Sequence, residues 1–257
     1  MDLLVNPQVN IDSGISITFK RLTKAEKREQ KKAAMKESRK LSRNKYRLRC
    51  KERKNNMNAD EKLEEKVNKD LAFAQLKLAM GTNTNNIYID LSYCSTLLSD
   101  DRDSNILKEK NSLCKQLCLS YNVLKTAINP VRLTITSLKH ANNIVSLLEK
   151  QGFNGWIIDK QDDEPWEISP IDKLIYLSPD ADEVLHDFDP NLIYIIGGIV
   201  DRTVQKNCSL NKANEKRIRT MRLPIQEYLP NRQTHVLNID HVLHIICDFL
   251  HTKVLLT

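Results

Sequence analysis

The sequence predicts an α/β domain with a mostly parallel sheet, preceded by a basic helical arm. Beyond residue 86, short runs rich in Ile, Val, Leu and Tyr alternate with segments of helical composition, a pattern typical of βαβ units. These apolar runs do not alternate strictly with polar residues, which favours strands covered on both faces. Residues 23–68 contain neither Gly nor Pro and are rich in Lys, Glu, Arg and Ala, which are good helix formers.

Charge divides the chain into an arm and a body. Residues 1–19 show no clear periodicity and are expected to be disordered, residues 20–80 form the arm, and residues 81–257 form the folded domain. Lys20 to Lys54 holds 17 Lys or Arg and four acids, a net charge of +13, whereas the whole chain carries +7 and the remainder therefore −6. Such an arm indicates a polyanionic partner, because Lys and Arg displace counterions from phosphates. A solvated charged helix or a localisation signal is the alternative.

The body is expected to begin after a hinge at residues 81–86. Its predicted strands are 87–92, 131–136, 156–159, 174–178, 192–200 and 221–225, and its predicted helices are 104–121, 138–151, 208–217 and 238–251. In open α/β sheets a ligand usually lies beyond the carboxyl ends of the strands. The loops that leave those ends are therefore the first candidates for a site.

The composition disfavours several kinds of site and location. No two of the six cysteines form a C-x-x-C pair, and Cys114 and Cys118 have no His at ligand spacing, so no metal is expected. No apolar stretch approaches the roughly 20 residues that span a bilayer, and the arm is too evenly polar to bury a face in lipid, so no membrane partner is expected. The first nineteen residues contain two acids and no base, which argues against a mitochondrial presequence and favours the nucleus or the cytoplasm.

The segment YIIGGIVDR, residues 194–202, is the most informative for chemistry. A buried strand runs into Gly197 and Gly198, where missing side chains let the backbone approach a ligand or another segment, and Asp201 follows closely. A tight turn is the alternative. The pair is not a G-x-G-x-x-G motif, and no glycine follows the first predicted strand until Gly152, which disfavours a Rossmann-type nucleotide enzyme.

Four further segments occur in a distinctive order around this pair. They are Ile89–Ser92 (IDLS), Tyr176–Asp180 (YLSPD), Arg222–Tyr228 (RLPIQEY) and Asn238–Val242, in which Asn238 can cap a helix. Together with Gly197–Asp201 (GGIVD), this order resembles the SPOUT-class tRNA methyltransferases that modify N1 of the purine at the ninth nucleotide of tRNA. The resemblance covers residues 87–251, and a basic helical arm before the domain is also a trait of that family.

The resemblance implies a deep trefoil knot in the last third of the chain and S-adenosyl-L-methionine (AdoMet) as the cofactor. The loops near 176–180, 197–202 and 221–239 would form a bent pocket for it. The residues expected to bind AdoMet are Leu177, Ser178, Pro179, Gly197, Gly198, Arg202, Met221, Leu223, Asn238 and Val242. The residues expected to bind tRNA are Lys31, Lys32, Arg39, Lys40, Arg43 and Arg47 in the arm and Lys125 in the body.

The same resemblance places the Asp201 carboxylate beside the transferring methyl group. Guanine N1 carries a proton at neutral pH, so a carboxylate within hydrogen-bond reach can act as the general base; a turn-forming role next to Arg202 is the alternative. Asp90 follows a buried strand and can either point into the same cleft or cap a helix through Ser92. Gln116 matches a family glutamine and is a candidate for contact with the target nucleotide, although a solvent-exposed Gln in mid-helix is the ordinary explanation.

The implied activity is methyl transfer to N1 of the ninth nucleotide, guanine first and adenine second, by a monomer whose arm helps to hold tRNA. The sequence departs from the family after Gln116, where Cys118–Lys125 has lost most of the basic residues, and after Asp201, where Arg202 is followed by Thr203. These departures are compatible with a divergent animal-type paralogue. They also leave open a non-catalytic tRNA-binding scaffold subunit of a tRNA-processing complex.

Overall fold

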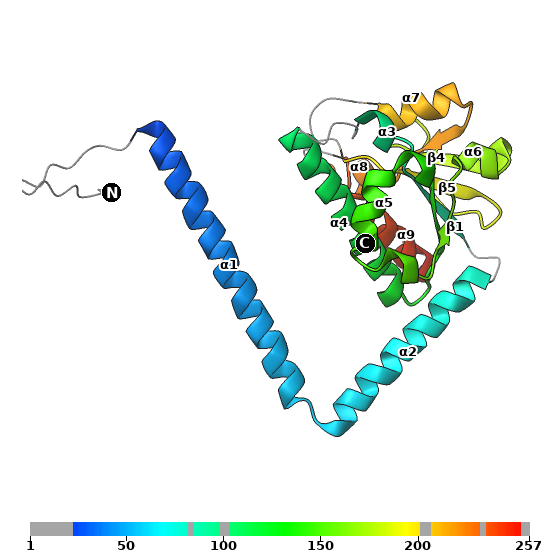
Figure 1. Ribbon diagram of the computed structural model, residues 1–257. Helices are drawn as coiled ribbons and strands as arrows, with labels where there is room; N and C mark the ends of the chain where they lie inside the picture. The colour runs from blue at the N-terminus through cyan, green and yellow to red at the C-terminus, as the bar shows by residue number, and fades with distance from the viewer. Residues whose placement is uncertain (1–22, 82–84, 98–102, 201–206, 232–234, 253–257) are drawn as a thin grey trace, which may run out of the picture. The chain divides into compact units, whose positions relative to one another are not determined.

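The computed structural model describes residues 23–81, 85–97, 103–200, 207–231 and 235–252 (Figure 1). The chain divides into two compact units, with the boundary between Glu65 and Lys66. Among the helices in these ranges, none is both long enough and apolar enough to cross a bilayer.

The first unit consists of α1 (Lys24–Asn56) and the beginning of α2 (Ala59–Gly81). Thr23 starts α1 through a capping box, in which its hydroxyl oxygen accepts the Glu26 backbone N–H and the Glu26 carboxylate accepts the Thr23 backbone N–H. Asn58 and Glu61 form the same reciprocal pair before α2. No residue of α1 is buried, so the helix predicted for this part of the chain is confirmed as a solvent-exposed one.

The second unit begins inside α2, earlier than the predicted boundary at residue 80. Leu76 has no exposed surface and belongs to the main core cluster of the body, and Ala79 is buried as well. Two buried residues at the end of a largely exposed helix give no periodic signal in the sequence. The last turns of α2 are therefore part of the folded body.

The described part of the body forms a six-stranded sheet in the order β3-β2-β1-β5-β4-β6, in which every paired strand is parallel. The strands are β1 (Asn86–Asp90), β2 (Arg132–Thr136), β3 (Asp159–Lys160), β4 (Leu174–Leu177), β5 (Ile193–Gly197) and β6 (Arg219–Met221). The predicted mostly parallel sheet is thus confirmed. Parallel strands place their carboxyl ends at one edge, and there Asp90 lies opposite both Thr136 and Gly197.

Two predicted strands are displaced along the chain. The third begins at Asp159 rather than residue 156, because Trp156 and Ile158 fill the core from a loop. The sixth ends at Met221 rather than residue 225, and Pro224, which has no N–H to donate, precedes a helix instead. A buried apolar residue next to a strand has the same hydrophobicity as a strand residue, so the sequence does not show whether its backbone pairs with a neighbouring strand.

Helices cover both faces of the sheet (Figure 1). The body helices are α3 (Cys94–Leu97), α4 (Ser104–Thr126), α5 (Asn142–Glu149), α6 (Pro165–Ile168), α7 (Cys208–Glu215), α8 (Ile225–Tyr228) and α9 (Ile239–Thr252), with 3-10 turns at Leu138–His140, Phe153–Gly155 and Ile171–Lys173. One core cluster joins the sheet to α4, α5 and α9, and a second joins its other face to α6 and α7. The four predicted helices correspond to α4, α5, α7 and α9.

The knot stays a prediction of the resemblance. The loop that follows β5 would take part in it, and residues 201–206 of that loop lie outside the described residues.

Candidate AdoMet site

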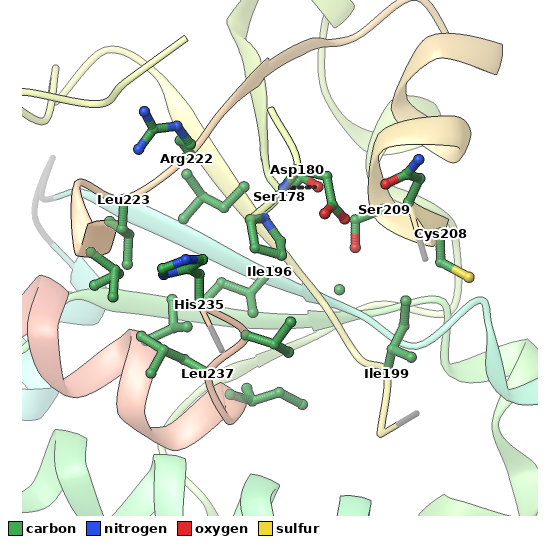
Figure 2. Close-up of a pocket in the computed structure, with 18 of the residues that line it drawn as sticks. Ser178, Asp180, Ile196, Ile199, Cys208, Ser209, Arg222, Leu223, His235 and Leu237 are labelled. Carbon is green, nitrogen blue, oxygen red and sulfur yellow. Dashed lines mark hydrogen bonds between the residues drawn. The ribbon is translucent and has the colours of Figure 1, made fainter. Parts of the chain in front are cut away.

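A cavity of about 980 Å³ opens at the carboxyl-terminal edge of the sheet (Figure 2). Cavities of several hundred to about 1,000 Å³ are the size that holds small-molecule ligands. Its walls come from the end of β4, the end of β5, α7, and residues within 222–226 and 235–242. These are the three loop regions that the sequence predicts for the pocket, with α7 added.

Six of the residues expected to bind AdoMet line this cavity: Leu177, Ser178, Pro179, Gly197, Leu223 and Val242. Three others, Gly198, Met221 and Asn238, are not among its lining residues, and two of these, Met221 and Asn238, accept hydrogen bonds from residues that are. The Met221 carbonyl accepts the Ser178 N–H at 2.9 Å, and the Asn238 carbonyl accepts the Val242 N–H at 3.0 Å. Arg202 and the candidate base Asp201 lie outside the described residues.

The two glycines have different neighbours. The Gly198 N–H donates to the Asp90 carbonyl at 2.8 Å, and a Cβ on Gly198 would lie 2.7 Å from that same oxygen and 2.6 Å from Leu91 Cδ2. A Cβ on Gly197 would lie 3.0 Å from the Ser209 hydroxyl, on the cavity wall. Gly198 thus makes room for the Asp90 carbonyl at the end of β1 and for the Leu91 side chain, and the cofactor contacts of both glycines stay a prediction.

Asp90 is fully buried and ties together several segments at the sheet edge. One carboxylate oxygen accepts the Ser92 backbone N–H at 2.9 Å and the Ser137 hydroxyl at 2.7 Å. The other accepts the Tyr176 phenol at 3.0 Å, with the Lys212 ammonium 3.8 Å away. This carboxylate thus accepts hydrogen bonds from three parts of the chain, has the Lys212 ammonium as an ion-pair partner, and is not among the residues that line the cavity.

Lys212 fastens α7 to this network. Its ammonium group donates to the Ser92 hydroxyl and lies 4.1 Å from the centre of the Tyr93 ring, a cation–π contact. Burial raises the pKa of the Tyr93 and Tyr176 phenols. Both phenols therefore stay protonated at neutral pH and remain available as donors. Because Ser209 and Asn211 of α7 line the cavity, the Lys212 contacts also hold that wall.

Gln116 is buried, not solvent-exposed, and its side chain holds the cavity wall from behind. Its Oε1 atom accepts the Ile239 backbone N–H at 3.0 Å, which ties α4 to the first turn of α9. Ile239 lines the cavity. The described structure thus gives Gln116 a contact within the protein, and the nucleotide contact implied by the resemblance stays a prediction.

The residues expected to bind tRNA lie mainly on α1. Those of the arm, Lys31, Lys32, Arg39, Lys40, Arg43 and Arg47, are all exposed. Lys125 lies at the end of α4, with its ammonium group 4.9 Å from the centre of the Tyr121 ring. Across the described residues no group of three or more His, Cys, Asp or Glu side chains is placed to hold a metal ion.

The cavity also has residues that the sequence did not single out. His235, Ser209 and Asn211 line it, as does Asp180 from the YLSPD segment. His235 precedes apolar residues in the run HVLNI. This pattern alone does not identify a binding residue, because it does not show that these residues lie at the cavity. Figure 2 shows His235 among Leu223, Ile196 and Leu237, whereas Asp180 and Ser209 lie on the side of α7.

Comparison with known proteins agrees with the family that the motifs resemble. The family described as tRNA (guanine(9)-N(1))-methyltransferase TRM10/TRM10A matches residues 17–255. The tRNA methyltransferase 10 homolog B of Mus musculus is 32% identical over 154 residues, which cover 57% of this chain and 48% of that protein. The tRNA (guanine(9)-N1)-methyltransferase of Schizosaccharomyces pombe is 35% identical over 151 residues, 57% and 49% of the two chains. The chain thus spans about half the length of the curated relatives it matches.

Solved structures agree as well. One described as a full-length spTrm10–SAH complex is 32% identical and superposes with a TM-score of 0.55, covering 66% of this chain and 89% of that one. Another, described as spTrm10(74), is 30% identical with a TM-score of 0.56, covering 67% and 89%. The family matches nearly the whole chain, the fold agrees, and four of the five motifs contribute residues to one cavity. The chain therefore belongs to the TRM10/TRM10A family of tRNA (guanine(9)-N(1))-methyltransferases.

Proposed function

We propose that this protein transfers a methyl group from AdoMet to N1 of guanine at the ninth nucleotide of tRNA, as a monomer. The observation that carries the proposal is the cavity built jointly by the ends of β4 and β5 and the start of α9. Family membership supports it, as does the related structure described as a complex with S-adenosylhomocysteine (SAH). Adenine at the same nucleotide is the second choice of substrate.

The residues of the cavity fit AdoMet. Leu223, Ile196 and Leu237 offer an apolar side suited to a flat heterocycle, and Asp180 and Ser209 offer a polar side suited to an amino acid. When bound, AdoMet supplies a methyl group on a positively charged sulfur atom. The protein has only to hold and orient two reactants, and positioning of this kind contributes on the order of 7–11 kcal/mol in favourable cases.

Asp201 is proposed as the general base. It follows β5 by four residues, and Ile199 between them lines the cavity. Guanine N1 has to lose its proton in the reaction, and a carboxylate held within hydrogen-bond reach can accept it. Adenine N1 carries no such proton, so the need for this base depends on the nucleobase.

The activity is tested by methyl transfer from labelled AdoMet to tRNA transcripts with G, A or C as the ninth nucleotide. We expect label on the guanine transcript, and Asp201→Asn to lower that rate by about a hundredfold or more, the usual size of a general-base contribution. Asp172→Asn, at an exposed turn before β4, serves as the matched control and should leave the rate unchanged. If the wild-type protein binds tRNA but neither binds AdoMet nor labels any transcript, it is a scaffold and the proposal fails.

The basic arm is proposed to hold tRNA through phosphate contacts. Replacing Lys31, Lys32 and Lys40 together by Gln should weaken tRNA binding and reduce the slope of log Kd against log salt concentration by about 0.7–0.9 for each phosphate that is no longer neutralised. Replacing the same three residues by Arg keeps the charge and should preserve the slope. Equal slopes for the Gln and Arg variants would show that these side chains do not contact phosphate.

A further inference from the structure

His235 brings a polar ring into the apolar side of the cavity. It is a lining residue, and Figure 2 places it among Leu223, Ile196 and Leu237. Its Nδ1 atom is buried and has no hydrogen-bond partner among the described residues. A buried nitrogen without a hydrogen-bond partner usually lowers the stability of the fold by about 1–3 kcal/mol. A ligand that forms a hydrogen bond with this nitrogen would remove that cost.

The neighbours of His235 restrict which ligand groups can form a hydrogen bond with its imidazole. Leu223, Ile196 and Leu237 present only hydrocarbon, and a charged ligand group placed among them would lose its hydration without replacement. A flat, uncharged heterocycle with polar atoms on its edge suits such a place. Rotation about the Cβ–Cγ bond of His235 is soft and exchanges Nδ1 with Cδ2, so the nitrogen can turn toward the cavity.

We propose that His235 recognises the adenine ring of the cofactor, with an imidazole nitrogen accepting a hydrogen bond from the adenine amino group. Neutral imidazole has one donor and one acceptor nitrogen, and adenine carries both an amino donor and ring acceptors on its edge. His235 is therefore a specificity-determining residue for the cofactor. The assignment rests on the proposed function, because it takes AdoMet as the ligand of this cavity.

The test measures binding of SAH to the full-length chain by calorimetry, without any turnover. His235→Leu should weaken SAH binding about fivefold, the effect of one lost hydrogen bond of about 1 kcal/mol. His235→Asn keeps a polar atom as near to the backbone as Nδ1 and should recover most of the affinity. His251→Leu, at an exposed position in the last turn of α9, is the matched control and should bind as the wild type does.

A second ligand tests whether His235 accepts its hydrogen bond from the adenine amino group. S-inosylhomocysteine carries an oxo group where SAH has the amino group, so the wild type should prefer SAH, and His235→Leu should reduce this preference about fivefold. Without ligand, His235→Leu should unfold no earlier than the wild type, since it removes an unpaired buried nitrogen. A purely structural histidine would instead lower the unfolding temperature.

The outcomes separate the two proposals. If the wild-type chain does not bind SAH, the proposed function fails. If the wild type binds SAH, but His235→Leu keeps both the affinity and the preference over S-inosylhomocysteine, only the assignment of His235 is overturned. Equal losses in the Leu and Asn variants would also overturn it, because the hydrogen bond would not be what the site needs.

Discussion

Gly198→Ala will lower the unfolding temperature and weaken SAH binding, although it adds a single methyl group. The new Cβ would lie 2.7 Å from the Asp90 carbonyl oxygen, an atom of the backbone that cannot move without disturbing β1. Overpacking of this kind costs about 1–3 kcal/mol, and a body of this size should melt about 5 °C lower. Because β5 ends at the cavity, the displacement should also raise the Kd for SAH about tenfold or more.

Gly155→Ala is the matched control for Gly198→Ala. A Cβ on Gly155 would meet no atom within 4 Å, so both its unfolding temperature and its SAH affinity should stay at the wild-type values. Thermal unfolding and calorimetry of the two variants give the comparison directly. If Gly198→Ala melts and binds like Gly155→Ala, the close approach of Gly198 to the Asp90 carbonyl is not what requires glycine there.

The order of elements in the body could be predicted from the sequence because strands that are buried on both faces are apolar at nearly every position. Runs such as Leu174–Leu177 and Ile193–Gly197 are apolar at nearly every position, as strands covered by two layers of helices require. Strand ends were less predictable. Trp156 and Leu223 are as buried as strand residues, yet they pack from loops, and hydrophobicity alone does not separate the two cases.

The site was predictable as a set of loops but not as a set of contacts. The sequence correctly marks Gly198 as a place of close approach, yet what approaches it is the Asp90 carbonyl, far away in the sequence. Gln116 reads as an ordinary polar residue in mid-helix until α9 packs beside α4 and offers its free Ile239 N–H. Such pairings arise from tertiary packing, and a single sequence carries no record of them.

The contacts of Asp90 also could not be predicted from the sequence, and they matter more for stability than those of Gly198 and Gln116. Its position at the end of β1 suggests either a catalytic acid or a helix cap, but the Ser92 N–H that it accepts lies before the first residue of α3, so this contact is a local turn and not a helix cap. Its other partners, Ser137, Tyr176 and Lys212, come from three distant segments. The buried carboxylate is therefore the point at which β1, β2, β4 and α7 are joined.

Asp90→Asn will destabilise the protein more than any other conservative change at this sheet edge. The amide NH2 group must replace one of two oxygens that now face only donors, and the Lys212 ammonium loses its charged partner. Removing one member of a buried ion pair costs about 3–5 kcal/mol, so the unfolding temperature should fall by about 10 °C. Asp159→Asn is the matched control, because its ion pair with Arg132 is partly exposed and such pairs contribute under about 1 kcal/mol.

A second substitution separates the charge from the hydrogen bonds. Adding Lys212→Met to Asp90→Asn removes the ammonium that has lost its partner, so the double variant should regain part of the stability lost by Asp90→Asn alone. An Asp90 that acted only on the substrate would behave differently. Its Asn variant would lose methyl transfer while melting at the wild-type temperature, and the addition of Lys212→Met would bring no recovery. Thermal unfolding of the wild type, Asp90→Asn, Lys212→Met and the double variant, with methyl transfer measured for each, therefore decides whether Asp90 holds the fold together or takes part in the reaction.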